Sequence, residues 1–342
     1  MSSSPPQRVL SNSSVKSILK HMNVGTRLRM SHYIPPLRGI EAASNLAVID
    51  HLTLERDQLI IDKTIFKIDY YDAEFSEDDE NGEESSYLQV TMKSGRFCNV
   101  ERLLNDNRYI PEAMQYLTKK LFGGRAPIRV RYLAIDKRGP DFFLPDDVKI
   151  VVRDIKVSHY AATDLEAFRP NMHSASFPLE TVTIKGAREL REDTEYYHPF
   201  IQTAKLIQIL DKAGAFPWDR VILELTNSQI HLECSKFQET IIMALIEKWE
   251  NRGGENGACF SMGVGCKTAL AACLDKVARR EDAELSKNQI FGCADIPNMI
   301  MIPMKTQKSK IGIYVSKNLW KHARGKFFSQ YDVNMAIFDF SE

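Results

Sequence analysis

The stretch Val130-Arg-Tyr-Leu133-Ala-Ile135 decides the fold, because its apolar-x-x-apolar-x-apolar pattern recurs along the chain. It recurs at Val152/Ile155/Val157, Leu179/Val182/Ile184, Ala204/Ile207/Ile209, Asn227/Ile230/Leu232 and Gly257/Phe260/Met262, and Ile49/Leu52/Leu54 fits upstream. From Val130 onward, successive copies begin 22, 27, 25, 23 and 30 residues apart. The pattern alone arises often by chance, so the inference depends on this spacing and on what lies between the copies. The spacing predicts one strand per copy.

Helices are predicted between these strands. Residues 235–251 have a capping box, Ser235 with Gln238, and an apolar face, and a second helix is predicted over 268–279. A single strand–helix unit cannot bury its apolar face alone and buries it against neighbouring units. The spacing of the copies is close to the period of 20–29 residues that is typical of leucine-rich repeats. We therefore predict an α/β (α+β) fold, a leucine-rich-repeat-like array of strand–helix units with a β-hairpin insertion, preceded by a short helical hairpin.

Five parts are predicted along the chain. They are a disordered start (1–11), a helical hairpin (12–40), a first strand unit (44–125), the repeat-like region (126–298) and a C-terminal β-meander that caps the array (299–342). Within the first strand unit, the predicted elements are strands at 46–54, 58–70 and 87–92, an acidic hairpin loop at 71–86, and a helix with Pro111 in its first turn. In the hairpin, Asn12 or Ser13 is the expected N-cap of the first helix, and Pro35-Pro36 is expected to end the second.

Composition limits the classes of function. The 342 residues carry 45 basic and 45 acidic side chains, so no net field is available to hold nucleic acid. The start of the chain has no apolar segment typical of a signal peptide, and no stretch of about 18 apolar residues follows. We expect a cytoplasmic or nuclear protein that binds neither nucleic acid nor membrane, with its six dispersed cysteines reduced and mostly buried.

Few residues suggest chemistry. Gly263-Val-Gly-Cys-Lys-Thr268 follows a predicted strand, as a phosphate loop does, but Cys266 stands where that loop needs a glycine before the lysine. The eight histidines are scattered without the spacing of metal ligands. No catalytic residue, metal ligand or cofactor site is predicted, and we expect the protein not to be an enzyme.

Two charged segments are candidate functional sites. Ser76, which precedes Glu77-Asp78-Asp79, is a candidate phosphorylation site on the acidic loop, against the simpler alternative of a solvated loop. Lys119, Lys120, Arg125, Arg129 and Arg131 form a local basic cluster, which is better explained as the solvated side of a helix and a strand than as a nucleic-acid site.

The amphipathic hairpin is the candidate partner-binding site. Its apolar positions are Val15, Ile18, Leu19, Met22, Leu28 and Met30. Three uses are open for them: to cap the first strand of the array, to bind a partner helix, or neither.

Several short segments, spread over nearly the whole chain, match a known family in their order and spacing. They include Ser14-Val-Lys-Ser-Ile-Leu-Lys-His-Met22, Arg27-Leu-Arg-Met-Ser31, Ile60-Ile-Asp-Lys-Thr64, Leu121-Phe-Gly-Gly-Arg125, Phe177-Pro-Leu-Glu-Thr-Val182 and Ile246-Glu-Lys-Trp249. Through these segments the chain resembles the nematode F-box C proteins, which carry a nematode-specific domain of unknown function. The resemblance implies that the N-terminal hairpin is F-box-like. It also implies that this hairpin binds the Skp1 subunit of a cullin-RING ubiquitin ligase through Ile18, Leu19, Met22 and Leu28, with Val15 and Met30 flanking them. The repeats are then expected to bind the substrate of the ligase.

Our preferred hypothesis is therefore a non-enzymatic substrate-recognition adaptor of a Skp1-cullin-F-box ubiquitin ligase, with Skp1 and an unknown substrate as protein partners. The alternative is a repeat-type protein-binding module with no ligase connection. A distant alternative is a nucleotide-binding protein that uses residues 263–268.

Overall fold

A computed structural model describes most of the chain. The described residues are 11–43, 48–72, 86–102, 109–136, 144–158, 160–186, 193–211, 216–286, 299–306, 308–317 and 331–339. The chain divides into two compact units, unit 1 (1–155 with 166–176) and unit 2 (156–165 with 177–342). The boundary falls within a strand of the predicted repeat-like region. No helix of the described residues has both the length and the apolar character needed to span a lipid bilayer.

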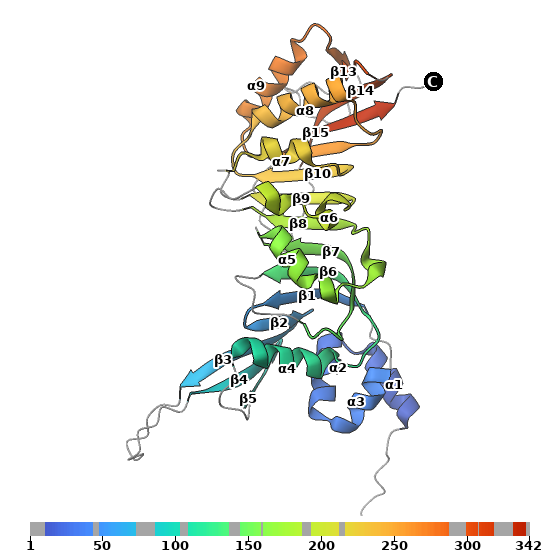
Figure 1. Cartoon of the computed structure of the whole chain (residues 1–342), viewed down its shortest axis with the longest axis vertical. Coiled ribbons are helices and arrows are strands. Elements are labelled where there is room, and N and C mark those ends of the chain that lie inside the picture. The colour runs from blue at the N-terminus through green and yellow to red at the C-terminus, as the bar shows by residue number, and fades with distance from the viewer. Residues whose placement is uncertain are drawn as a thin grey trace, which may run out of the picture. The chain divides into compact units, whose positions relative to one another are not determined.

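Unit 1 joins three N-terminal helices to a mixed sheet (Figure 1). The helices are α1 (Asn12–His21), α2 (Val24–Tyr33), α3 (Pro35–Ala43) and α4 (Ile110–Phe122). The strands are β1 (Ile49–Glu55), β2 (Gln58–Ile61), β3 (Thr64–Asp72), β4 (Ser86–Ser94), β5 (Phe97–Arg102), β6 (Ile128–Asp136) and β7 (Ile150–Val157). The strand order is β7-β6-β1-β2-β3-β4-β5, with β1 and β6 parallel and β1 to β5 an antiparallel meander.

Unit 2 alternates strands and helices before an antiparallel end. The strands are β8 (Thr181–Lys185), β9 (Leu206–Asp211), β10 (Gln229–Cys234), β11 (Cys259–Val264), β12 (Glu284–Ser286), β13 (Met299–Pro303), β14 (Ser309–Lys317) and β15 (Tyr331–Asp339). The helices are α6 (Pro199–Gln202), α7 (Trp218–Glu224), α8 (Glu239–Arg252) and α9 (Lys267–Ala278), and α5 (Ala161–Phe168) crosses the unit boundary. Strands β8 to β11 are parallel, β15 runs antiparallel beside β11, and the order continues β14-β13-β12.

The recurring apolar positions lie opposite one another in these sheets. In unit 1, Leu52 pairs with Leu133 and Leu54 with Ile135. In unit 2 the row of second positions is Val182, Ile207, Ile230 and Phe260, and the row of third positions is Ile184, Ile209, Leu232 and Met262. Each of these side chains is at most 8% exposed. The spacing in sequence therefore corresponds to a register in space within each unit.

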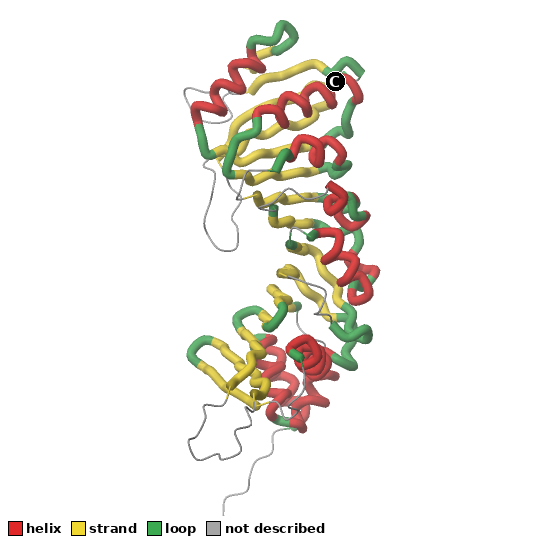
Figure 2. Tube along the Cα trace, turned by 60° about the vertical axis from the view of Figure 1, so that its left-hand side comes forward, coloured by secondary structure: helices red, strands yellow, loops and turns green. Residues whose placement is uncertain are grey.

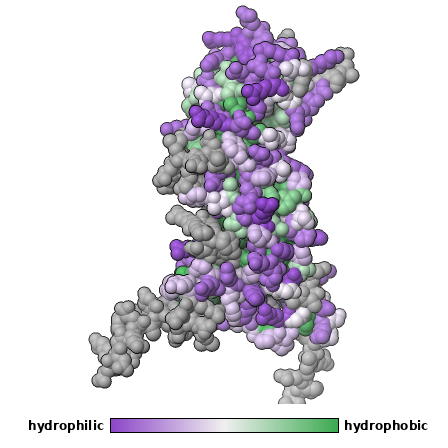
Figure 3. Space-filling model, viewed as in Figure 1, coloured by the Kyte–Doolittle hydropathy of each residue, from purple (hydrophilic) through white to green (hydrophobic). Residues whose placement is uncertain are grey.

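Helices α7 and α8 cover one face of the unit 2 sheet, as Figures 1 and 2 show. Since successive side chains of a strand point to opposite faces, the apolar rows face these helices and the alternate residues face away from them. Hydrophilic side chains predominate over the helix-bearing side in Figure 3, with apolar patches between them. The core of the unit thus lies between helices and sheet.

The predicted strand 58–70 is two strands joined by a tight turn at Asp62-Lys63. Asp62 has a φ of 54°, a conformation that aspartate tolerates better than most residues. Its carboxylate accepts hydrogen bonds of 3.0 Å from the amides of Asp50 and His51, which fixes the turn against β1. The apolar run concealed this break. A second tight turn, at Gly95 (φ 59°), leads into β5, a strand that was not predicted from the sequence.

The N-terminal hairpin is three helices rather than two. Pro35 does not end the helical segment: it opens α3, since proline at the first helical position loses no hydrogen bond. Ser11, not Asn12 or Ser13, is the N-cap of α1. The predicted capping box of the helix at 235–251 is also wrong, because α8 begins at Glu239 and the Gln238 amide donates to the Phe216 carbonyl instead.

A buried ion-pair cluster joins the N-terminal helices to α4. Glu41 of α3 is fully buried, and its carboxylate lies 3.1 Å from Arg27 Nε of α2 and in contact with Arg125 just after α4. The Arg125 guanidinium also donates to the Leu121 carbonyl at 2.9 Å. Burial lowers the pKa of Arg27, and Glu41 opposes that shift. Removing one partner of such a buried set leaves an unpaired charge, so the cluster fixes the three helices on unit 1.

Gly25 of α2 packs directly on the turn between β2 and β3. A Cβ there would lie 2.6 Å from Thr64 Cβ and 3.0 Å from the Ile61 carbonyl oxygen, whereas a Cβ at Gly39 of α3 would meet nothing within 4 Å. We predict that Gly25→Ala lowers the free energy of unfolding by about 1–3 kcal/mol through overpacking. Gly39→Ala should raise it by roughly 0.5–1 kcal/mol, because alanine favours the helix. Urea denaturation measures both, and equal stabilisation by the two variants would contradict this packing.

Candidate functional site

The face of the unit 2 sheet that points away from α7 and α8 carries polar residues at its centre. On β10, Ile230 and Leu232 belong to the apolar rows, so His231 and Glu233 point to the opposite face. Cross-strand pairing places Ser261 of β11 beside His231, and Gly263 beside Glu233. The polar face therefore follows from the same alternation that builds the core.

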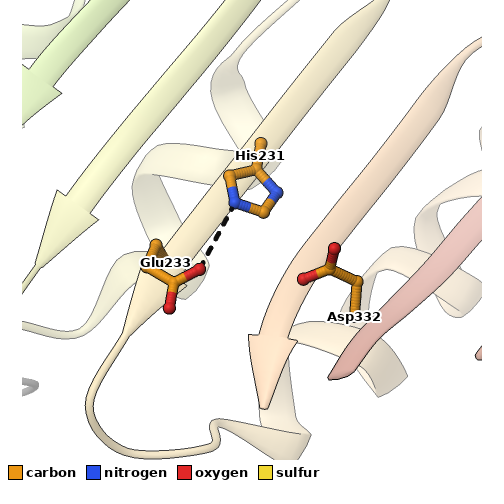
Figure 4. Close-up of side chains that lie close together, drawn as sticks. All are labelled: His231, Glu233 and Asp332. Atoms are coloured by element: carbon orange, nitrogen blue, oxygen red, sulfur yellow. Dashed lines mark ion pairs between the residues drawn. The ribbon is translucent and has the colours of Figure 1, made fainter. Parts of the chain in front are cut away.

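Strand β15 completes the site from the far end of the sequence. Asn334 pairs with Ser261 and Asp332 pairs with Gly263. Two rows result, one of His231, Ser261 and Asn334 and one of Glu233, Gly263 and Asp332. We call His231, Glu233 and Asp332 the β10–β15 cluster (Figure 4).

The cluster is closely spaced and buried. His231 Nε2 lies 3.6 Å from Glu233 Oε2, and His231 Nδ1 lies 2.7 Å from Ser261 Oγ. One ligand atom from each of the three residues lies within 4.8 Å of those of the other two. The exposed fractions of His231, Glu233 and Asp332 are 0%, 1% and 2%. Two carboxyl groups and an imidazole are thus held together away from solvent.

The buried environment of the cluster shifts the pKa of Asp332. Burial raises the pKa of its carboxyl from 3.8 to about 6, while His231 opposes the rise and Glu233 adds to it. A shift of this size is equivalent to about 3 kcal/mol of preference for the neutral form in the folded protein. The folded state then binds more protons than the unfolded chain between about pH 4 and pH 6, so this group's contribution to stability falls as the pH rises through that window.

The arrangement offers two kinds of chemistry. A serine hydroxyl beside a histidine that lies near a carboxylate is the composition of a nucleophilic catalytic set. Ser261 is only 5% exposed and His231 is fully buried, so a substrate does not reach the hydroxyl in this structure. The second possibility is cation binding, which needs imidazole and carboxylate groups at short separation but no substrate access.

The N-terminal residues proposed from sequence fall into two groups. Leu19 and Leu28 are 2% and 0% exposed and pack in the core of the helical module, so they are not available to a partner there. Ile18 is 50% exposed, and Val15, Met22 and Met30 are partly exposed. The structure therefore does not place all six on one open face.

Other sequence predictions are placed as follows. Gly263 lies inside β11, between Glu233 and Asp332, so of the two glycines only Gly265 lies in the turn before α9. The segment 263–268 therefore does not have the form of a phosphate-binding loop. Ser76 lies outside the described residues. Of the described cysteines, Cys234 and Cys273 are buried but Cys98 and Cys266 are exposed, so the expectation that most are buried is wrong for this part of the chain.

The basic cluster is also divided by the structure. Arg125 is buried against Glu41 and holds the N-terminal helices, so it does not belong to a solvated face. Arg131 lies on β6, is 69% exposed and pairs with Asp50 at 3.2 Å. One basic residue of the set is therefore structural.

Sequence reasoning missed the β10–β15 cluster. His231-x-Glu233 on one strand puts both side chains on one face, and this spacing was the available local signal. Asp332 is about a hundred residues away, and only the insertion of β15 next to β11 brings it near.

We predict that Asp332→Asn stabilises the protein above pH 6. In the presence of a chelator, its free energy of unfolding should exceed that of the wild type by up to about 3 kcal/mol at pH 7, because a neutral amide replaces a buried charge. The difference should shrink toward zero at pH 4. Urea denaturation across pH 4–8 measures it, and a difference independent of pH would contradict the assigned environment of Asp332.

Part of the chain matches a known protein family. Residues 109–265, from the N-cap of α4 through the end of β11, match the family described as "Domain of unknown function (DUF3557)". The segment contains His231, Glu233, Ser261 and Gly263 but not Asp332. No curated protein and no solved structure matches the chain. Residues 109–265 are thus similar to a family whose description states no function.

Proposed function

We propose that the protein is a non-enzymatic protein-interaction adaptor that recognises substrates for a ubiquitin ligase of the Skp1-cullin-F-box type, in keeping with its resemblance to nematode F-box C proteins. The N-terminal helices α1 to α3 bind Skp1, and the strand–helix units bind the protein to be modified. This function belongs to the cytoplasm or nucleus.

The observation that carries the proposal is the apolar surface left on a folded helical module. Leu19, Val24 and Leu28 are buried, yet Ile18 exposes 50% of its surface and Tyr33 and Ile34 expose 42% each. Exposed large apolar side chains on a helical module can provide the anchors of a protein-binding surface. Some apolar residues of the module therefore remain exposed after its own core has formed.

Attachment of the module to unit 1 suits an adaptor. Glu41 with Arg27 and Arg125 forms a buried connection, and Tyr33 reaches Asn99 of β5 and Met92 of β4 through its hydroxyl. A helical module held in this way presents its exposed residues in a fixed orientation to the sheet of its own unit. A fixed orientation lowers the entropy lost when a partner binds.

We propose further that the strand–helix units form a leucine-rich-repeat-like array. In-register apolar rows support this, and so does a recurring asparagine. Asn227, just before β10, donates from Nδ2 to the carbonyls of Ile201, Gln202 and Ala204 at 2.7–3.1 Å, at the end of α6 and in the loop that leads into β9. Asn171 makes the same kind of contact with the carbonyls of Leu144, Pro145 and Val148 at 2.9–3.4 Å, before β7.

A second candidate is a protein-binding module of the same construction with no ligase connection. The burial of Leu19 and Leu28 favours it, because two of the four residues that the resemblance assigns to Skp1 serve the module's own core. In this case α1 to α3 act only as a cap on unit 1.

We predict that purified protein captures Skp1 and that Ile18→Asp weakens this binding at least tenfold. A charge introduced in the centre of an apolar contact loses the desolvated packing on which such contacts depend. Binding is measured by calorimetry or by a quantitative pull-down with recombinant Skp1. Leu19→Asp is unsuitable, since it places a charge in the core.

Ser17→Asp is the matched control. Ser17 is exposed on the same helix, next to Ile18, and receives the same single charge. It should bind Skp1 like the wild type, and circular dichroism should show the same fold for both variants. No binding by the wild type would leave the module without a ligase connection as the better hypothesis. Equal binding by the wild type and Ile18→Asp would instead contradict the assignment of Ile18 to the Skp1 contact.

A further inference from the structure

The β10–β15 cluster has the ligand types of a metal site. His231 and Glu233 lie two residues apart on β10 and share a face, and Asp332 reaches the same face from β15. Among the described residues, this is the group of three or more His, Cys, Asp or Glu side chains with the spacing to hold an ion. All three are buried, unlike the exposed acidic groups that occur commonly without a ligand.

Gly263 makes the approach of the two carboxyl groups possible. It lies on β11, between Glu233 and Asp332 in one cross-strand row. Neighbouring strands are spaced about 4.8 Å apart, so the α-carbons of Glu233 and Asp332 are separated by about 10 Å. Because glycine has no side chain, both carboxyl groups lean over β11 toward each other, as Figure 4 shows for the labelled residues.

The distances fit a small divalent ion after slight adjustment. Bonds to zinc are about 2.0–2.2 Å long and usually tetrahedral, so two ligand atoms on one ion are about 3.4 Å apart. The cluster atoms lie within 4.8 Å of one another. Binding of an ion would therefore require side-chain rotations that move the ligand atoms by up to about 1 Å toward a common centre.

A second observation points to a ligand. Asp332 Oδ1 is buried and has no hydrogen-bond partner, and the residue is 2% exposed. A buried polar atom without a partner is costly, by about 1–3 kcal/mol and more when it is charged. Asp332 lies with its carboxyl group toward His231 and Glu233 in Figure 4. A cation there would satisfy it.

The surroundings of His231 also suit metal binding. Its Nδ1 lies 2.7 Å from Ser261 Oγ, and its Nε2 lies on the side of Glu233. A hydrogen bond at one ring nitrogen orients the other toward a metal, and this arrangement accompanies most histidine ligands. Ser261 thus has a role in the site that does not need access by a substrate.

We propose that His231 Nε2, Glu233 and Asp332 bind one divalent transition-metal ion of the zinc class. An imidazole ligand favours zinc over magnesium or calcium, which take oxygen ligands. The carboxylates of Glu233 and Asp332 neutralise the charge of a divalent ion, so the ion and its ligands can be buried without net charge. A carboxylate that binds through both oxygens, or a water, supplies the fourth position. The ion would link β10 to β15 across β11, a structural role that is independent of the proposed adaptor function.

The test uses the full chain after treatment with EDTA and dialysis. Titration with Zn²⁺ should show one ion per chain by elemental analysis and a raised melting temperature, as expected for an ion that binds only the folded state. Mg²⁺ should give no shift. Asp332→Asn should keep its fold, melt in EDTA no lower than the wild type, and bind Zn²⁺ at least tenfold more weakly.

Asp164→Asn is the matched control. Asp164 is also a buried aspartate of unit 2, but its carboxylate accepts from the amide and hydroxyl of Ser158, away from the cluster. This variant should melt lower than the wild type and retain the wild-type affinity for Zn²⁺. His231→Gln provides a second loss of a ligand should Asp332→Asn fail to fold.

Two outcomes would overturn the proposal. One is uptake of Zn²⁺ with the same affinity by the wild type, Asp332→Asn and His231→Gln, which would place the ion elsewhere, for example on the exposed thiols of Cys98 or Cys266. The other is no uptake by the wild type above the level of a protein blank. Neither result bears on Skp1 binding, so this proposal and the proposed function stand or fall separately.

Discussion

The alternation of side chains along parallel strands in register is the constraint on which the rest of the structure depends. Once Ile230 and Leu232 of β10 face the helices, His231 and Glu233 between them must face the other way. A slip of one residue would place the polar pair under α7 and α8 and the apolar pair on the opposite face of the sheet. The energy of burying the apolar rows therefore also fixes the position of the polar cluster, although the cluster contributes nothing to that burial.

The N-terminal module depends on a different kind of interaction. Its connection to unit 1 is polar and buried, through Glu41 and two arginines, while its own core is small. Such a connection specifies one orientation, because displaced charges would be left unpaired in a dry environment. Apolar residues such as Ile18 remain exposed on the module, where the proposed partner would bind. The two halves of the proposed adaptor are thus built on separate physical principles.

Local patterns predicted the strands and the long helices, but not the features set by tertiary contacts. The apolar recurrences located β6 to β11, and Pro111 and Gly123 bracketed α4, because burial on one face leaves a periodic trace in the sequence. The turn at Asp62 depends on amides of β1, and the start of α8 depends on a contact with Phe216. Of the β10–β15 cluster, His231 and Glu233 were visible as a pair, whereas Asp332 required the pairing of β15 with β11. Whether Leu19 faces a core or a partner depends on packing, which a helical stripe does not specify.

The register of β10 against β11 is the most direct test of this account. Gln229 is exposed and lies opposite the native Cys259, at a strand spacing that a disulfide can bridge. Under mild oxidation, Gln229→Cys should form an intramolecular bond to Cys259, identified by peptide mass spectrometry, and Ser228→Cys, one residue away, should not. Equal cross-linking of the two variants, or a bond to Cys259 from Ser228→Cys alone, would contradict the register and with it the site built on it.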